Sequence, residues 1–149
     1  MIIYAPKPIP EKGKAIFLAG SIEMGKAYNW QEYLAQNIDH SNLLILNPRR
    51  KDWDNSWKEE IKNPQFHDQV TWELNALERA GLIVMYFDPG TKSPISLLEL
   101  GLFARSQKMI VCCPDGYWKK GNVDVVCERY GVKQLDSLDE ILNEIKTFA

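Results

Sequence analysis

The chain has 149 residues, of which 45% are hydrophobic and 26% are charged, and its formal net charge is −2. This length and composition predict one globular domain that buries roughly two thirds of its unfolded surface. The charge gives no reason to expect a nucleic-acid polymer or an anionic membrane as partner, and no run of about 20 apolar residues could span a bilayer. Three cysteines without C-x-x-C spacing (Cys112, Cys113, Cys127) and an N-terminus unlike a signal peptide predict a cytoplasmic protein with reduced thiols.

The first half of the chain alternates short apolar runs with helical stretches. Ala15–Ala19 predicts a buried strand that ends at Gly20-Ser21, and Tyr28–Ile38 predicts a helix. A second strand is expected at Leu43–Leu46. It is followed by the long polar loop NPRRKDWDNSWKEEIKNP. Long loops in compact domains are usually functional or disordered, and this one holds too many aromatic residues for an idle linker.

The second half continues the alternation. Pro64 is expected to begin a helix that ends near Ala80, and Leu82–Phe87 is the clearest strand. Ser93 and Pro94 have the residue types preferred at the N-cap and first position of the next helix. The remaining elements are strands at Met109–Cys113 and Val132–Leu135, a helix over Trp118–Tyr130, and a final amphipathic helix behind the capping box Ser137-Leu138-Asp139-Glu140.

Five strands interleaved with helices predict an α/β fold, a flavodoxin-like doubly wound five-stranded parallel sheet with helices on both faces. One domain is expected over residues 1–149, with its core starting at about residue 14. Ligands of such a fold bind beyond the carboxyl ends of the strands. Candidate functional residues are therefore sought first in the segments that follow the strands.

The turn Gly20-Ser21-Ile22-Glu23-Met24-Gly25 follows the first strand. It could present backbone N–H groups and a hydroxyl to a phosphate or to a sugar hydroxyl. It is not a P-loop, because no Gly-Lys-Ser/Thr follows, and it lacks G-x-G-x-x-G spacing. A glycine that only lets the chain turn explains the sequence equally well.

Glu99 lies inside the apolar run ISLLELGLFA, on the helix after the third strand. Ile95, Leu102 and Phe103 are three or four residues away, which predicts that Glu99 shares their inward-facing side. A carboxylate on an apolar face is costly unless it is paired or used, and desolvation would raise its pKa. The alternative is a half-exposed glutamate paired with Arg105 or Arg79.

Two further carboxylates are candidates. Glu73, in QVTWELNALERA, is either a solvated helix charge or a group that approaches the crevice. Asp88 ends the third strand, where ligands bind in this fold, but it could equally start the Asp88-Pro89-Gly90 turn. Tryptophans usually serve packing, yet Trp53 and Trp57 in one polar loop suit a surface that stacks on a heterocyclic base.

Together these segments resemble a known family. FLAGS, NPRR, WELNALERA, MYFDPGTKSPISLLELGLFARSQK and CCPDGYWKKGNVD occur in the order seen in the nucleoside 2-deoxyribosyltransferases and their relatives, the deoxynucleotide N-hydrolases. The resemblance spans about residues 15–130. Its most specific part is the Glu99-Leu100-Gly101 motif, which here is one residue longer before Ala104.

The resemblance implies roles for particular residues. The glutamate of the E-L-G motif is the family's nucleophile, which is Glu99 here, and a carboxylate that helps to bind the base falls on Glu73. An asparagine that reaches a neighbouring subunit's site falls on Asn122. Catalytic roles are thus expected for Glu99, Glu73 and Asp88. Substrate contacts are expected from Phe17, Gly20, Ser21, Asn47, Arg49, Trp53, Trp72 and Asn122.

Two departures from the family pattern affect these roles. Phe17 stands where many members have a tyrosine that holds the nucleophile, and Ala80-Gly81 stands where many have an aspartate. Neither change touches the nucleophile, but protonation of the leaving base must then come from another residue. Glu73 or Asp88 could supply that proton.

The resemblance predicts an enzyme that exchanges the bases of 2'-deoxynucleosides through a deoxyribosyl-Glu99 intermediate, with net retention. Such chemistry needs no metal or organic cofactor. The expected partners are deoxynucleosides, free nucleobases and further copies of the chain that share active sites. One alternative is a hydrolase of 2'-deoxynucleoside 5'-monophosphates, which Ser21, Arg49 and Arg50 would favour. Another is a nucleotide-binding module without catalysis, with Glu99 as a buried structural acid.

Overall fold

The fold is a parallel α/β sandwich, seen in a computed structural model that describes residues 1–23 and 27–149. The sheet of the described residues has six strands in the order β1-β3-β2-β4-β5-β6, and all neighbouring strands run parallel. The strands are β1 (Ile2–Tyr4), β2 (Lys14–Gly20), β3 (Leu43–Asn47), β4 (Leu82–Tyr86), β5 (Met109–Cys112) and β6 (Lys133–Leu135). The main helices are α1 (Trp30–Asn37), α2 (Pro64–Arg79), α3 (Pro94–Phe103), α4 (Lys120–Tyr130) and α5 (Leu138–Phe148).

This architecture confirms the predicted flavodoxin-like α/β class and corrects the strand count from five to six. The additional strand, Ile2–Tyr4, pairs with β3 at the edge of the sheet and precedes the expected start of the core. Three residues ahead of a proline-rich stretch are too few to show a period of two, so the sequence pattern did not reveal them. The end of the predicted Gly20–Gly25 turn, Met24-Gly25, lies outside the described residues.

Two helix starts and one helix cap also differ from the predictions. Helix α1 begins at Trp30 rather than Tyr28, because Asn29 is its cap and accepts a hydrogen bond from the Glu32 N–H. Helix α4 begins at Lys120 rather than Trp118. Ser93 precedes α3 as predicted, but it has left-handed backbone angles and its hydroxyl does not cap the helix.

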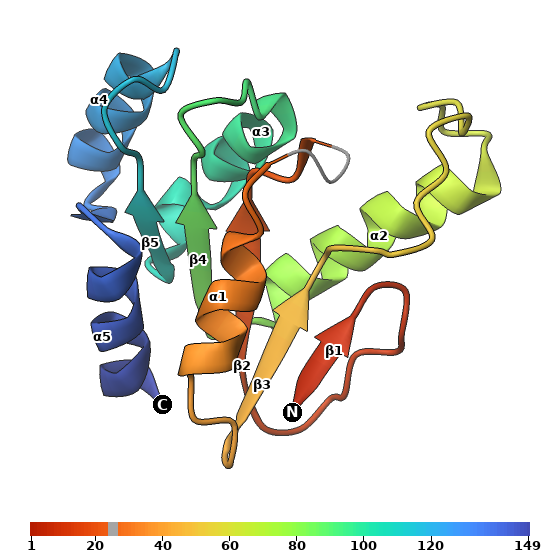
Figure 1. The fold of residues 1–149 in the computed structure, drawn as a ribbon, viewed down its shortest axis with the longest axis horizontal. Helices are drawn as coiled ribbons and strands as arrows, with labels where there is room; N and C mark the ends of the chain where they lie inside the picture. The colour runs from red at the N-terminus through yellow and green to blue at the C-terminus, as the bar shows by residue number, and fades with distance from the viewer. Residues whose placement is uncertain (24–26) are drawn as a thin grey trace.

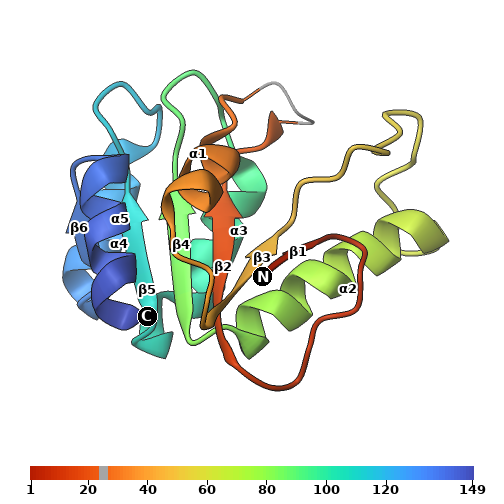
Figure 2. The ribbon, with the colours of Figure 1, turned by 60° about the horizontal axis from the view of Figure 1, so that its bottom comes forward.

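Helices cover both faces of the sheet (Figures 1 and 2). Alternate strand residues such as Phe17, Met85 and Val111 form one core with apolar residues of α2, α3 and α4. The intervening residues, such as Leu18 and Val84, form the other core with α1 and α5. Strands buried on both faces read as continuous apolar runs, which is why the central strands could be predicted from the sequence. Among the described residues, no helix has both the length and the apolarity that crossing a membrane requires.

The chain reverses its direction of winding between β2 and β4. β2 is followed by β3 on one side, whereas β4 leads to β5 and β6 on the other. Gly20 ends β2 at φ +123°, and a Cβ there would lie 2.2 Å from the Tyr86 carbonyl oxygen. Glycine is therefore needed for the two strands to approach this closely at their carboxyl ends. Parallel α/β proteins bind ligands at this kind of switch point.

Candidate active site

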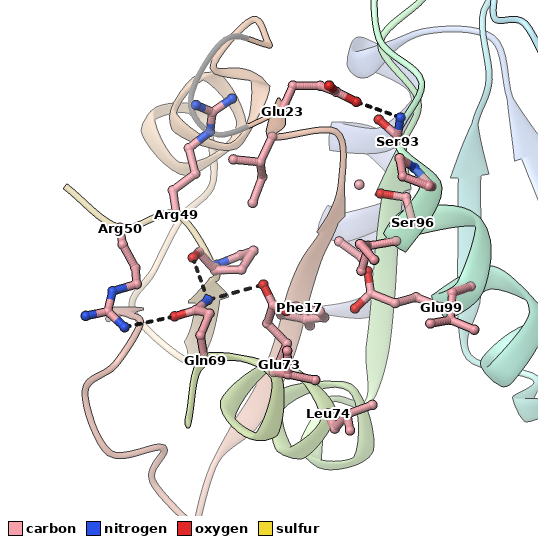
Figure 3. Close-up of a pocket in the computed structure, with 18 of the residues that line it drawn as sticks. Phe17, Glu23, Arg49, Arg50, Gln69, Glu73, Leu74, Ser93, Ser96 and Glu99 are labelled. Carbon is pink, nitrogen blue, oxygen red and sulfur yellow. Dashed lines mark hydrogen bonds between the residues drawn. The ribbon is translucent and has the colours of Figure 1, made fainter. Parts of the chain in front are cut away.

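A cavity of about 530 Å³ opens beyond the carboxyl ends of β2 and β3, between α2 and α3 (Figure 3). Phe17, Ala19 and Gly20 of β2 form part of its wall, and Glu73 of α2 and Glu99 of α3 project into it. The segment between β3 and α2 adds further side chains and extends beyond the sheet in both ribbon views. The cavity therefore gathers residues far apart in the sequence.

Glu99 is buried, with 8% of its surface exposed. Burial, together with the charge of Glu73, raises the pKa of the Glu99 carboxyl to about 8. Among the described residues, no group donates a hydrogen bond to this carboxylate. Arg79 and Arg105, the alternative partners, are engaged elsewhere: Arg79 donates to the carbonyls of Pro10 and Gly13, and Arg105 to the Tyr130 hydroxyl. Glu99 therefore faces the cavity.

The apolar neighbours of Glu99 lie differently from the prediction. Ile95 and Leu102 were expected to point inward, but they are 58% and 57% exposed. Both nevertheless line the cavity, together with Leu98. An apolar run in this helix marks the wall of a cavity as well as the core, and periodicity alone does not separate the two.

Glu73 projects from α2 into the same cavity (Figure 3). Its Oε1 accepts a hydrogen bond of 3.2 Å from Gln69 Nε2, whose amide also donates to the Pro48 carbonyl. Burial raises the pKa of Glu73 to about 7, although the Gln69 hydrogen bond works in the opposite direction. Helix α2 presents the two side chains together because residues four apart share one face.

Two carboxyl groups with raised pKa values thus share one cavity. Near pH 7 to 8 such a pair can hold one proton, which leaves one group able to donate a proton and the other able to attack or to stabilise a cation. This combination is what cleavage of a glycosidic bond requires: an acid for the leaving group and a carboxylate for the anomeric carbon.

Aromatic side chains form other parts of the wall. Phe17, Phe66 and Trp53 line the cavity. Trp53 packs edge-on against Trp57, with ring centroids 5.2 Å apart, and the buried Trp53 indole N–H has no hydrogen-bond partner among the residues that the structure describes. Trp72 does not line the cavity: it packs edge-on behind Phe17, and its indole N–H donates to the Lys7 carbonyl.

The two arginines of the NPRR segment line the cavity, but their guanidinium groups bind protein acceptors. Arg49 donates to Gln31 Oε1 and to the carbonyls of Ala27 and Tyr28. Arg50 donates to both carboxylate oxygens of Asp52 and to Gln69 Oε1. Asn47, from the same segment, is buried beside them and accepts a hydrogen bond from the Arg49 N–H rather than lining the cavity.

Ser21 and Asp88 make hydrogen bonds that hold the loops next to the cavity. The Ser21 hydroxyl accepts from the Asp88 N–H at 2.8 Å and bonds to the hydroxyls of Thr91 and Ser93. The Asp88 carboxylate accepts from the backbone N–H groups of Tyr28 and Gly90. Neither residue lines the cavity, so the structure brings Glu73, rather than Asp88, together with Glu99.

Asn122 lies apart from this cavity. It is exposed in the first turn of α4 and lines a second, shallower hollow with Leu97 and Trp118. Within one chain it is therefore separated from Glu99, and a substrate contact from Asn122 requires a neighbouring subunit.

Five polar residues of the cavity were not singled out as candidates for its lining: Glu23, Glu59, Gln69, Ser93 and Ser96. Gln69 carried a signal, since it precedes Glu73 by one helical turn. Ser96 precedes Glu99 by three residues, a spacing that also places two side chains on one face of a helix. Glu23 carried none, because its position depends on the left-handed backbone at φ +48° and on contacts with a loop 70 residues away.

The fold and the cavity place this chain among the parallel α/β proteins that bind ligands at the carboxyl edge of the sheet. The family model described as "Nucleoside 2-deoxyribosyltransferase like" matches residues 13–117, a span that contains β2 to β5 and both cavity glutamates. The chain belongs to this nucleoside 2-deoxyribosyltransferase-like family, which confirms the resemblance inferred from its motifs.

Comparisons with curated proteins and with solved structures support the fold and nothing further. No curated protein matches the chain in sequence. The crystal structure of a conserved protein from Enterococcus faecalis V583 is similar over 93% of this chain and 100% of that chain, with a TM-score of 0.62 and 14% sequence identity. At this identity the likeness supports the architecture and carries no information about activity.

Burial of Glu99 makes the stability of the protein depend on pH. Its pKa rises from 4.5 to about 8 on folding, so between these values the folded chain keeps a proton that the unfolded chain releases. The free energy of unfolding therefore falls as pH rises through this range. Glu99→Gln removes the effect, so relative to wild type the variant should gain on the order of 3 kcal/mol between pH 5 and pH 8. Urea unfolding at both pH values measures this gain; an equal difference at the two would contradict it.

Proposed function

We propose that this protein is a nucleoside 2-deoxyribosyltransferase that exchanges the bases of 2'-deoxynucleosides through a covalent intermediate on Glu99. The observation that carries the proposal is the pairing of Glu99 and Glu73 in one cavity at the switch point of the sheet. Membership of the nucleoside 2-deoxyribosyltransferase-like family supports nucleoside-type ligands.

In the first half-reaction a carboxylate oxygen of Glu99 attacks the anomeric carbon, C1'. The bond between C1' and the base nitrogen breaks, its electron pair goes to the base, and Glu73 donates a proton to the departing base. The products are a neutral base and a deoxyribosyl ester of Glu99. The developing oxocarbenium character at C1' is stabilised by the Glu99 carboxylate.

In the second half-reaction another base attacks C1' from the side that the first base left. Glu73 takes a proton from the incoming base, the ester bond breaks, and Glu99 regains its carboxylate. Two inversions give net retention, and no atom or electron is left over. The step needs no group beyond the two glutamates and the bases.

The walls of the cavity suit such a substrate. Phe17 and Phe66 are apolar surfaces beside the two carboxyls, and Trp53 offers an aromatic ring for a base. Gly20 contributes backbone atoms to the wall. Apolar walls also exclude water, and this favours transfer to a second base over hydrolysis.

We also infer that the sites are shared within a homo-oligomer. The α3 side chains Ile95, Leu98 and Leu102 are 57–60% exposed at the rim of the cavity, where a second copy would bury them. Asn122 is exposed and lies away from its own chain's cavity, so a neighbouring subunit is the route by which it would contact substrate.

Incubation with 2'-deoxyinosine and free adenine tests the proposed function. We expect 2'-deoxyadenosine and hypoxanthine as products, in equal amounts and with the β-configuration retained. A parallel reaction with thymidine and free cytosine covers the pyrimidines. Free deoxyribose without a new nucleoside would identify a hydrolase, and no turnover of any substrate would favour a binding module; either result would contradict the proposal.

A further inference from the structure

Ser96 is a buried polar residue of the cavity that the proposed reaction does not use. It is 4% exposed, and it lines the cavity from the first turn of α3. Glu99 lies three residues further along the same helix, a spacing that places both side chains on one face. Figure 3 shows both on the side of α3 that faces the cavity. Across residues 1–23 and 27–149, the Ser96 hydroxyl and the Glu99 carboxyl make no hydrogen bond.

The usual backbone acceptor of such a hydroxyl is occupied. A serine inside a helix commonly donates to the carbonyl four residues earlier, which here is the carbonyl of Lys92. That carbonyl already accepts two hydrogen bonds, from the Tyr117 hydroxyl at 2.5 Å and from the Trp118 indole N–H at 2.8 Å. A carbonyl oxygen has two lone pairs, and both are used here. The Ser96 hydroxyl is therefore left to find an acceptor in the cavity.

The Glu99 carboxylate lacks a donor that its role in the reaction requires. It must be ionised to attack C1', yet burial and the charge of Glu73 raise its pKa to about 8, above the value of about 7 for Glu73. When the pair holds one proton, that proton lies mainly on Glu99, whereas the reaction needs it on Glu73. A hydrogen bond donated to the Glu99 carboxylate favours its charged form and so moves the proton to Glu73.

Ser96 is well placed to donate this hydrogen bond. The described part of the cavity lining contains two hydroxyl groups, and the hydroxyl of Ser93 already bonds to those of Ser21 and Thr91. The Ser96 hydroxyl changes direction by rotation about a single bond, Cα–Cβ. It can therefore meet a carboxylate on the next turn of the helix without any shift of the backbone.

We propose that Ser96 is a positioning residue for the nucleophile: its hydroxyl donates a hydrogen bond to the Glu99 carboxylate when that group ionises, and holds it toward C1' of the nucleoside. The inference rests on the proposed function for the role of Glu99. Ser96 keeps its own proton, so no bond to it forms or breaks during the reaction. Without this hydroxyl the pKa of Glu99 rises, and less of the protein has the reactive arrangement of charges at neutral pH.

The pKa of Glu99 in the free protein tests the proposal without turnover. Protein labelled with ¹³C at the glutamate side-chain carboxyls is titrated by NMR, and the Glu99 signal is the one that Glu99→Gln removes. We expect Ser96→Ala to raise the pKa of Glu99 by at least ~0.5. Ser96→Thr keeps a hydroxyl on the same carbon and should leave this pKa within ~0.3 of the wild-type value. Ser106→Ala is the control, because it removes an exposed hydroxyl outside the cavity and should not move this pKa.

Base exchange provides the second measurement. Ser96→Ala should lower kcat at pH 7 by at least ~5-fold while KM stays within ~2-fold of wild type, because the hydroxyl acts on the nucleophile rather than on the bound nucleoside. Ser96→Thr should restore most of the lost kcat. Thermal unfolding confirms that each variant is folded.

An unchanged pKa of Glu99 in Ser96→Ala would overturn the proposal, as would an equal rise of this pKa in Ser96→Thr. A loss confined to KM would also overturn it, since it would show that Ser96 contacts the substrate instead. The titration needs no substrate, so it is independent of the assay that decides the proposed function. A protein that fails to exchange bases can still show a Glu99 pKa that depends on Ser96.

Discussion

Glu99→Gln should lower kcat for base exchange by at least about a thousandfold. Glutamine keeps the size of the side chain but cannot form the deoxyribosyl ester, so the covalent route is lost while the cavity keeps its shape. Nucleoside binding should persist, because the loss lies in the chemical step rather than in recognition of the ligand. Single-turnover kinetics with 2'-deoxyinosine and adenine measures the effect.

The control for this variant is Glu128→Gln, which changes an exposed carboxylate on α4 outside the cavity and should leave kcat within about twofold of wild type. A 2-fluorinated deoxynucleoside provides a direct check, since its slow turnover should leave an adduct that peptide mass spectrometry assigns to Glu99. Retained activity in Glu99→Gln, or an adduct on another residue, would rule out Glu99 as the nucleophile.

Glu99 could be predicted from the sequence because its signal is local. A carboxylate in the apolar run ISLLELGLFA carries a desolvation cost, and such a cost points to a functional site. The central strands could be predicted for a related reason: burial on both faces makes them apolar throughout. Glu73 needed the family resemblance, because a glutamate on an amphipathic helix is usually solvated.

The remaining part of the site depends on contacts that no local pattern encodes. Ser21, Asp88 and Glu23 follow strands at the correct edge of the sheet, yet only Glu23 lines the cavity. The Ser21 hydroxyl instead accepts a hydrogen bond from the Asp88 N–H, and the Asp88 carboxylate accepts from the N–H groups of Tyr28 and Gly90. A polar side chain that follows a strand can either hold a loop in place or face a ligand. Only the tertiary structure shows which of these two roles a given residue has.

The arginines of the NPRR segment also have roles that the sequence alone does not distinguish. A pair of arginines predicts a phosphate site when the sequence is all that is known. In the folded chain Arg49 is half-buried, and burial lowers its pKa while its donors bind Gln31 and two backbone carbonyls. An arginine that fixes a loop and one that binds a substrate have the same sequence signature.

Glu73→Gln should reduce kcat by about 10²- to 10⁴-fold for bases that leave poorly, because the amide cannot transfer a proton to the departing base. The deficit should shrink for deoxynucleosides whose bases carry electron-withdrawing groups, since these leave without full protonation. Glu78→Gln is the matched control, because Glu78 is exposed on the same helix and lies outside the cavity. A deficit that is equal for good and poor leaving groups would show that Glu73 only positions the substrate.

The pH dependence of kcat/KM distinguishes a proton-transfer role of Glu73 from a positioning role more directly than the comparison of leaving groups does. In the wild type, kcat/KM should rise through about pH 7 and fall above about pH 8, because turnover needs the coupled pair to hold one proton. Glu73 has the lower pKa of the two, so the reactive form, with Glu99 ionised and Glu73 protonated, is the less populated form of the singly protonated pair. In Glu73→Gln the alkaline fall should disappear, because the group that must stay protonated is gone. The acidic rise should move to lower pH, because the charge of Glu73 no longer raises the pKa of Glu99. A variant that keeps both limbs at their wild-type positions would show that Glu73 is not the acid and that another group protonates the base.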